Sequence, residues 1–105
     1  MKLAEEIKKE IISNILKVVK ARKIVLFGSY ANGMANEESD IDILIIEKEV
    51  DSKIQEKRKI RKSLKNIKCS KDILVTSEEE YNVYSLKYGS IYKEIDEKGE
   101  VLWSF

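Results

Sequence analysis

The stretch that decides the fold runs from Ile24 to Ile46 and reads IVLFGSYANGMANEESDIDILII. It begins with an apolar run typical of a buried strand and passes through a turn at Gly28 and Ser29. It ends in a second apolar run that opens with Asp40 and Asp42. Side chains alternate between the two faces of a strand, so both aspartates are expected on one face. Two neighbouring carboxylates repel each other, and a shared divalent cation relieves that repulsion. The stretch therefore predicts two strands with a cation-binding edge.

The turn at Gly28 and Ser29 offers backbone N–H groups and a hydroxyl, which suit phosphate oxygens. Gly28 and Gly33 also share the G-x-x-x-x-G spacing of a P-loop. A P-loop requires Lys and then Ser or Thr after the second glycine, but Met34 and Ala35 stand there. The P-loop interpretation is excluded. A phosphate-binding turn beside paired carboxylates indicates nucleotide chemistry, although each motif alone also fits an ordinary turn or a solvated strand start.

Gly-Ser followed by Asp-x-Asp on the next strand resembles the nucleotidyltransferase superfamily that includes the palm of DNA polymerase β. The short chain resembles its minimal nucleotidyltransferase branch, the partner proteins of HEPN toxins, over nearly its whole length. The resemblance implies a third carboxylate on a later strand, and Asp72 in the run 71–75 meets that expectation. The runs 88–95 and 99–103 also resemble the end of that branch. One departure is Asn32, where many relatives carry an arginine.

Composition limits the classes of function. Hydrophobic residues make up 43% and charged residues 37% of the 105 residues, which predicts one globular domain over 1–105. The resemblance implies that this single domain is a nucleotidyltransferase domain. The net charge of +1 argues against a protein built mainly for nucleic-acid or membrane adhesion. There is no histidine and only one cysteine, Cys69, which excludes a Cys/His zinc site and a Ser-His-Asp triad. No signal peptide or apolar run of roughly 20 residues is present, so we expect a cytoplasmic protein without a membrane partner.

Hydrophobic spacing and helix-capping residues predict the order of helices and strands. The expected elements are an amphipathic helix over 3–20, a strand over 24–27, a brief helix after Ser29, a strand over 40–46, a helix from a capping box at Ser52 and Gln55 to about Lys68, a strand over 72–75, one or two helices from a capping box at Ser77 and Glu80 to about Lys98, and an edge strand over 100–103.

The places of the motifs constrain the topology. Gly28 and Ser29 end the first strand, whereas Asp40 and Asp42 begin the second, so these strands must run antiparallel to reach one ligand. Asp72 lies near the start of the third strand, which a long helix joins to the second, so a parallel right-handed crossover is expected. The predicted fold class is α/β, with a mixed sheet and helices packed against it.

The resemblance implies a nucleotidyltransferase that depends on Mg²⁺, with two ions expected. Asp40 and Asp42 would hold the ion bound to the triphosphate. Asp42 and Asp72 would share a second ion roughly 3.5–4 Å away, which lowers the pKa of the acceptor hydroxyl. Asp72 could also accept the acceptor's proton, since no histidine exists to do so. The three aspartates are therefore the candidate catalytic and metal-binding residues.

The same resemblance implies ATP as the nucleotide substrate. Gly28, Ser29 and Ser39 are the candidate nucleotide-binding residues, with the first two at the β- and γ-phosphates. The chain has no residues left for an acceptor-binding lobe, so we expect a partner protein to supply the acceptor. The resemblance names a HEPN toxin, silenced by AMP on a tyrosine, and makes this chain a type VII-like antitoxin. Nucleic acid would then be met only through that partner.

Two alternatives remain open from the residues alone. One is a non-catalytic antitoxin or binding module that blocks its partner by contact, which should bind neither ATP nor Mg²⁺. The other is a transferase for a small-molecule or RNA acceptor, which the lysines and arginines of the helix over 53–68 could support, although such a run is usually a solvated face. Tyr81, Tyr84, Tyr88 and Tyr92 have near-helical spacing and are expected mainly to pack, or else to meet a partner.

Overall fold

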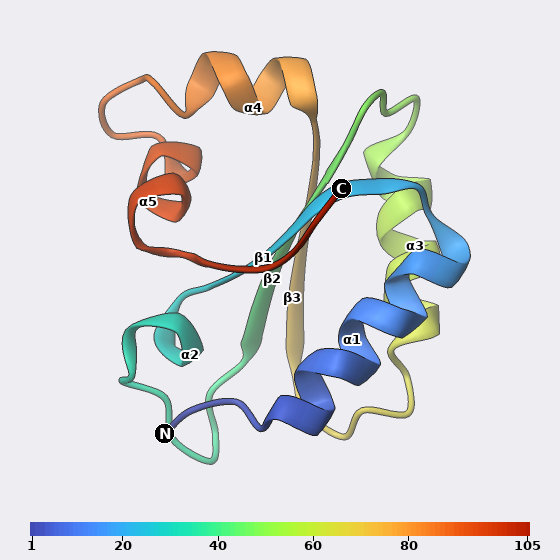
Figure 1. The fold of residues 1–105 in the computed structure, drawn as a ribbon, viewed down its shortest axis with the longest axis vertical. Coiled ribbons are helices and arrows are strands. Elements are labelled where there is room, and N and C mark those ends of the chain that lie inside the picture. The colour runs from blue at the N-terminus through green and yellow to red at the C-terminus, as the bar shows by residue number, and fades with distance from the viewer.

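A computed structural model describes residues 1–105 as one mixed sheet with helices on both faces (Figure 1). The elements in chain order are α1 (Glu5–Val18), β1 (Ala21–Phe27), α2 (Ser29–Asn32), β2 (Ile41–Glu47), α3 (Lys53–Ser63), β3 (Lys71–Ser77), α4 (Glu78–Tyr84), α5 (Ile91–Lys98) and β4 (Glu100–Ser104). The strand order is β3-β2-β1-β4; β1 is antiparallel to β2 and β4, and β2 is parallel to β3. The predicted mixed α/β fold is confirmed.

Alternate residues of β2 enter two separate cores. Ile43 and Ile45 belong to the larger cluster, which also contains Ile11 of α1 and Ile60 of α3. Leu44 and Ile46 belong to a smaller cluster with Tyr81 of α4 and Ile95 of α5. Figure 1 shows the same division, with α1 and α3 on one side of the sheet and α4 and α5 on the other. The short α2 lies at the end of β1, where its Tyr30 and Ala31 pack against the larger cluster. Asp42 is two residues before Leu44, so its side chain lies on the face of α4 and α5.

The helix after β2 is shorter than predicted. It ends at Ser63 rather than near Lys68 because the chain turns to bring Leu64 and Ile67 into the core, where 0% and 6% of their surfaces remain exposed. Lys71 Nζ donates hydrogen bonds to the carbonyls of Ile67 and Cys69 at 2.6 and 2.7 Å. The lysine thereby satisfies carbonyls that a continuing helix would have used.

The other boundaries differ by a few residues from those predicted. β1 begins at Ala21, and β2 begins at Ile41, so Asp40 lies just before the strand. The predicted N-caps are present: Ser52 Oγ accepts from the N–H of Gln55, and Ser77 Oγ accepts from the N–H of Glu80. None of the helices combines the length and the apolar character needed to cross a bilayer.

Candidate active site

The sheet register brings two of the predicted carboxylates side by side. Asp42 of β2 lies opposite Phe27 of β1 and, on its other flank, opposite Asp72 of β3. Residues at matched positions of neighbouring strands present their side chains on the same face, so Asp42 and Asp72 are adjacent. The antiparallel and parallel pairings that the motifs required are therefore both present. Asp40 adjoins this pair from the segment just before β2.

Gly28 lies directly against the Asp42 carboxylate. Its backbone has φ +71° and ψ −151°, a conformation that residues with a Cβ rarely adopt. A Cβ built on Gly28 would be 2.1 Å from Asp42 Oδ2, which is closer than non-bonded atoms can approach. Both the conformation and the space therefore require glycine at this position. The turn at the end of β1 is thus in contact with the carboxylate at the start of β2.

The short helix α2 is built on the carbonyl of Gly28. The N–H groups of Ala31 and Asn32 donate to that carbonyl at 3.0 and 3.1 Å. The first N–H groups of a helix have no acceptor within it, so those of Ser29 and Tyr30 are available to an anion. This arrangement positions Ser29, the predicted phosphate ligand, one residue from the contact with Asp42.

The charge of the three aspartates has no cationic partner within the chain. Burial, then the charges of Asp72 and Asp40, raises the pKa of the partly buried Asp42 carboxyl. Asp40 and Asp72 are exposed, and none of the six ion pairs of the structure includes any of the three. Lys71 adjoins Asp72 in sequence, but its ammonium is bound to the two carbonyls described above. The negative charge at this edge is therefore uncompensated.

An uncompensated set of carboxylate oxygens is the donor chemistry that Mg²⁺ prefers, because this ion keeps few protein ligands and fills its shell with water and phosphate. No group of three or more His, Cys, Asp or Glu side chains is gathered closely enough to hold one ion. The three aspartates could therefore bind a cation only in pairs, each of which includes Asp42. The residues present fit a cation whose remaining ligands come from the substrate.

Ser39 shapes the loop before Asp40. Its hydroxyl accepts from the N–H of Asn36 at 2.9 Å, and its own N–H donates to the Asn36 carbonyl at 3.1 Å. The thiol of Cys69 lies 3.7 Å from the Ser39 carbonyl and also raises the pKa of the Tyr30 hydroxyl, after the larger effect of burial. The hydroxyl of Ser39, a predicted nucleotide-binding group, is therefore engaged in a local turn.

A cavity of about 180 Å³ opens beside Gly28, between α2 and α5. Asn32 lines it from α2, while Ile91, Glu94 and Lys98 line it from α5. The sequence motifs assigned no site role to these α5 residues, which lie more than sixty positions after Gly28; the run 88–95 indicated only the family resemblance. Only the packing of α5 on the sheet brings them to the site.

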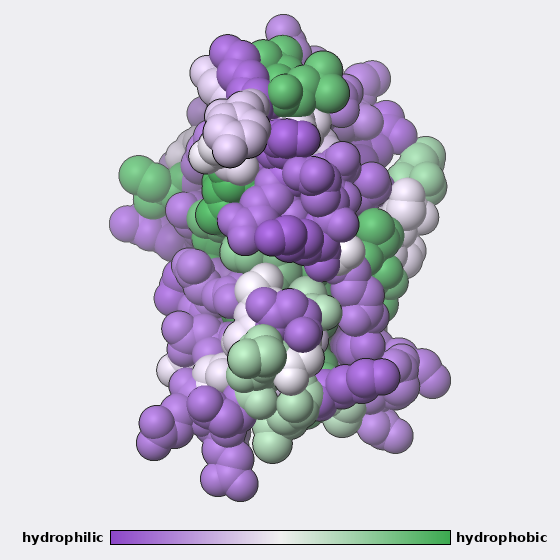
Figure 2. Space-filling model, turned by 90° about the vertical axis from the view of Figure 1, so that its left-hand side faces the viewer, coloured by the Kyte–Doolittle hydropathy of each residue, from purple (hydrophilic) through white to green (hydrophobic).

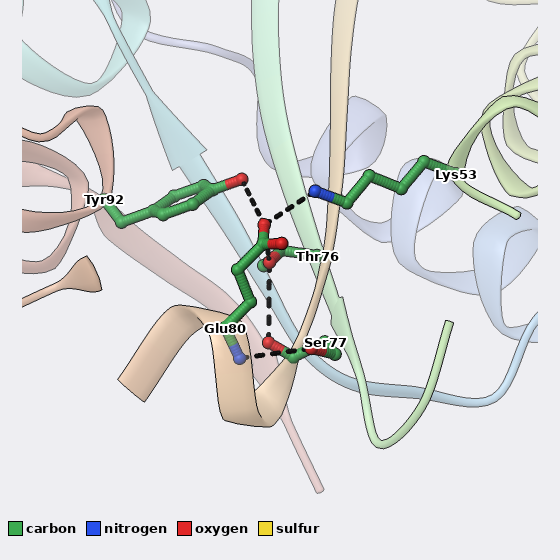
Figure 3. Close-up of polar contacts among 5 residues, drawn as sticks. All are labelled: Lys53, Thr76, Ser77, Glu80 and Tyr92. Carbon is green, nitrogen blue, oxygen red and sulfur yellow. Dashed lines mark hydrogen bonds and ion pairs between the residues drawn. The ribbon is translucent and has the colours of Figure 1, made fainter. Parts of the chain in front are cut away.

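A polar network holds α5 and α4 in place (Figure 3). Glu80 Oε2 accepts from Lys53 Nζ at 2.6 Å, Thr76 Oγ1 at 2.8 Å and the Tyr92 hydroxyl at 3.1 Å. The hydrogen bond from Lys53, followed by that from Thr76, lowers the pKa of Glu80. Four elements, α3, β3, α4 and α5, therefore meet at one carboxylate.

The tyrosines of this region divide into two kinds. Tyr81 is buried and donates to Asp96 Oδ1 at 2.7 Å, and its ring lies 5.9 Å from that of Tyr92. Tyr84 and Tyr88 are exposed, Tyr88 at 97%. Figure 2 shows this side of the molecule, with hydrophilic atoms over most of it and hydrophobic atoms in several separate patches, one of them at the top. Packing thus accounts for Tyr81 and Tyr92, as expected, but not for the other two.

The model of one protein family, described as "Polymerase beta, Nucleotidyltransferase", matches residues 5–104. A protein of Methanocaldococcus jannaschii is 43% identical over 76 residues, which are 72% of this chain and 74% of the relative. Its name is "Putative protein adenylyltransferase". The family match covers nearly the whole chain, including Gly28 and the three aspartates.

Solved structures with the same fold include toxin–antitoxin complexes. A toxin–antitoxin with AMP-PNP has a TM-score of 0.71 at 21% identity, over 93% of this chain and 73% of that one. A tri-AMPylated Shewanella oneidensis HEPN toxin in complex with an MNT antitoxin has a TM-score of 0.65 at 20% identity, over 96% and 72%. At these identities the likeness establishes the fold.

Proposed function

Because the chain belongs to the polymerase β nucleotidyltransferase family, we propose that it transfers AMP from ATP to a hydroxyl of a partner protein, with Mg²⁺ as its cofactor. The observation that carries the proposal is the contact between Gly28 and Asp42. It sets the phosphate-binding turn against a carboxylate that is flanked by Asp72 and has no counter-cation. Phosphoryl transfer depends on such positioning and charge compensation more than on covalent chemistry by the protein.

Each group at the site has a role in this reaction. Asp40 and Asp42 would hold the Mg²⁺ bound to the triphosphate, and Asp42 and Asp72 a second ion. Bound Mg²⁺ supplies charge compensation for the phosphates and a lower pKa for the attacking hydroxyl. The backbone around Gly28 and the hydroxyl of Ser29 orient the β- and γ-phosphates. Ser39 supports binding by shaping the loop before Asp40.

The transfer step needs no reactant other than ATP and the acceptor hydroxyl. The acceptor oxygen forms a bond to the α-phosphorus, and the bond from that phosphorus to the oxygen of the β-phosphate breaks. Pyrophosphate leaves with the electron pair, and the proton of the hydroxyl passes to Asp72. Residues 1–105 act in this proposal as one catalytic domain in the cytoplasm.

We take a tyrosine of a HEPN toxin as the acceptor, which makes this chain an antitoxin. Two similarities support the choice. The M. jannaschii relative bears the name of a protein adenylyltransferase, and the S. oneidensis fold neighbour is an MNT antitoxin bound to an AMPylated HEPN toxin. The three aspartates and Ser29 are all present, which favours an enzyme over a module that acts by contact alone.

The test mixes the purified chain with its copurifying HEPN partner, ATP and Mg²⁺. Intact-mass spectrometry should show one or more AMP additions on a partner tyrosine, and Asp72→Asn should abolish them. A partner that stays unmodified but is inhibited equally by the Asp72→Asn protein would show a contact antitoxin. AMP found only on a small molecule or an RNA end would contradict the protein acceptor.

A further inference from the structure

The end of α5 is held firmly against β1 beside the active site. Gly99, the residue after α5, packs so closely that a Cβ there would be 2.6 Å from the Ile95 carbonyl oxygen and 2.7 Å from Val25 Cγ1. The next residue, Glu100, pairs with Leu26 in the sheet. Leu26 is two residues before Gly28, so the last turn of α5 lies at the end of β1. The place of Lys98 therefore follows from sheet pairing and not from a mobile loop.

Lys98 is the cationic residue that lines the cavity beside Gly28. The wall opposite it carries the neutral amide of Asn32. Lys98 takes part in none of the six ion pairs, in contrast to Lys93 of the same helix, which pairs with Glu97 at 3.2 Å. Glu94 also lines the cavity, but it is not within ion-pairing distance of Lys98. A cation without a partner thus adjoins the phosphate-binding turn.

We propose that Lys98 binds the β- and γ-phosphates of the nucleoside triphosphate, in the cavity between α2 and α5. The inference rests on the proposed function, since it assigns a further residue to the same substrate. An ammonium group binds phosphate oxygens as a point charge, and the long lysine stem can follow the leaving pyrophosphate. Glu94 opposes that charge and moderates the affinity. Asn32 supplies hydrogen bonds but no charge from the other wall.

Lys98 has a simpler role as well, because a lysine in the last turn of a helix interacts favourably with the helix dipole. If that were its only role, replacing Lys98 would lower stability without changing the affinity for any ligand. The cavity and the missing ion pair predict instead that replacing Lys98 weakens binding, and weakens it more for ligands with more phosphates. The two roles therefore separate in a binding experiment.

The experiment measures the Kd of ATP, AMP and tripolyphosphate by isothermal titration in Mg²⁺, with the full chain. Lys98→Met should weaken ATP and tripolyphosphate by at least about tenfold, the loss expected for one charged hydrogen bond. Its effect on AMP should be within about twofold. Lys93→Met, on the same helix, is the matched control and should change none of the three.

Two further variants test the sign of the charge effect. Glu94→Gln should tighten ATP and tripolyphosphate, because it removes the negative charge of the cavity. Asn32→Arg in the Lys98→Met background should recover most of the lost affinity, because it places a cation on the opposite wall of the same cavity. Rescue by Asn32→Arg would be unexpected if Lys98 acted only on the helix dipole.

The outcomes distinguish this inference from the proposed function. Equal losses for ATP and AMP would mean that the cavity holds the nucleoside, and unchanged ATP affinity would mean that Lys98 serves the helix alone; either result overturns the inference while transfer by the wild type stands. A wild type that binds tripolyphosphate through Lys98 but transfers no AMP would overturn the proposed transferase and keep the subsite. A wild type that binds neither ATP nor tripolyphosphate would overturn both.

Discussion

The two ends of strand β2 carry acidic groups that differ in their neighbouring cations. At its start, Asp42 lies beside Asp72 with no lysine or arginine in an ion pair with either. At its end, Glu47 is buried next to Glu56, which pairs with Lys59 at 2.9 Å. We call the first the catalytic edge, after the function proposed for it, and define it by Gly28, Asp40, Asp42 and Asp72. The second is the closed edge, defined by Glu47, Glu56, Lys59, Lys53, Thr76 and Glu80.

The comparison shows that carboxylates at the two ends of one strand have different effects. At the closed edge, Glu56 and Glu80 are matched by lysines and hydroxyls of the same chain, so these two carboxylates contribute to stability; Glu47 is the exception, because its buried Oε2 has no hydrogen-bond partner. Those of the catalytic edge repel one another, so they cost stability and leave the compensating charge to a ligand. Substitutions should therefore affect transfer at one edge and unfolding at the other.

The largest effect is expected from Asp42→Asn combined with Asp72→Asn. AMP transfer should fall by at least roughly 10²–10³-fold, because charge stabilisation of that order is lost. The metal-free Tm should rise slightly as the repulsion disappears, and Mg²⁺ with ATP should no longer raise it. Radiolabelled AMP transfer and thermal melts with and without Mg²⁺ measure both. Glu47→Gln at the closed edge is the control and should transfer normally; a drop in the metal-free Tm of the double variant would contradict the account.

Gly28→Ala should damage both transfer and stability. The added Cβ would meet Asp42 Oδ2, and displacement of a reacting group by about 1 Å can cost about 10²-fold in rate. The strained backbone should add about 1–3 kcal/mol of destabilisation. Gly33→Ala is a matched control, since Gly33 also has a positive φ, +81°, but a Cβ added there would meet no atom within 4 Å. Similar losses of transfer in the two variants would show that strain alone, and not contact with Asp42, matters.

Glu80→Ala should reduce stability at the closed edge. It removes the acceptor of the buried Thr76 hydroxyl and of the half-buried Tyr92 hydroxyl, and the ion-pair partner of the exposed Lys53, at a cost of about 1–3 kcal/mol and therefore a Tm lower by at least about 4 °C. Glu79→Ala, an exposed neighbour on α4, is the control.

The loss in Glu80→Ala should depend on pH. The pKa of Glu80 is lowered in the folded state, chiefly by Lys53, so its ionised form stabilises the fold above the ordinary value of 4.5. This stability disappears as the pH falls through the lower folded pKa. The Tm difference from wild type should thus be full at neutral pH and shrink below pH 4.5; a difference that grows in acid would contradict the ion pair.

An effect on unfolding with no loss of transfer is expected from Glu47→Gln. Burial, followed by a hydrogen bond with Glu56, raises the pKa of Glu47 to about 8, and Glu47 Oε2 has no hydrogen-bond partner. The folded state therefore favours the protonated acid, and wild type loses this contribution as the pH rises from 4.5 through about 8. Glutamine cannot ionise, so the Tm advantage of Glu47→Gln over wild type should grow across that range and then level off. Glu49→Gln, which is exposed, should show no such trend.

Much of the fold followed from local patterns. The amphipathic helix, the buried strands, the N-caps at Ser52 and Ser77 and the edge position of the last strand depend on periodicity and on hydrogen bonds within three residues. The antiparallel and parallel pairings were predicted because Gly28, Asp42 and Asp72 can reach one ligand only in that topology. The end of α3 was wrong because burial of Leu64 and Ile67 outweighs helix propensity, and such burial depends on distant elements.

What the sequence determined by itself is the set of residues at the catalytic edge: a glycine turn, then two aspartates at the start of the second strand, one just before it and one within it, then a third on the next strand. These residues are close in sequence or follow from the alternation of side chains along a strand, so short-range sequence patterns are enough to predict their positions. The tertiary structure alone decided that Gly28 touches Asp42, that the Lys71 ammonium binds two carbonyls and that Lys98 shares a cavity with Gly28. These contacts depend on how the sheet and the helices pack. Residues far apart in the chain come into contact only when several elements bury their apolar surfaces against one another.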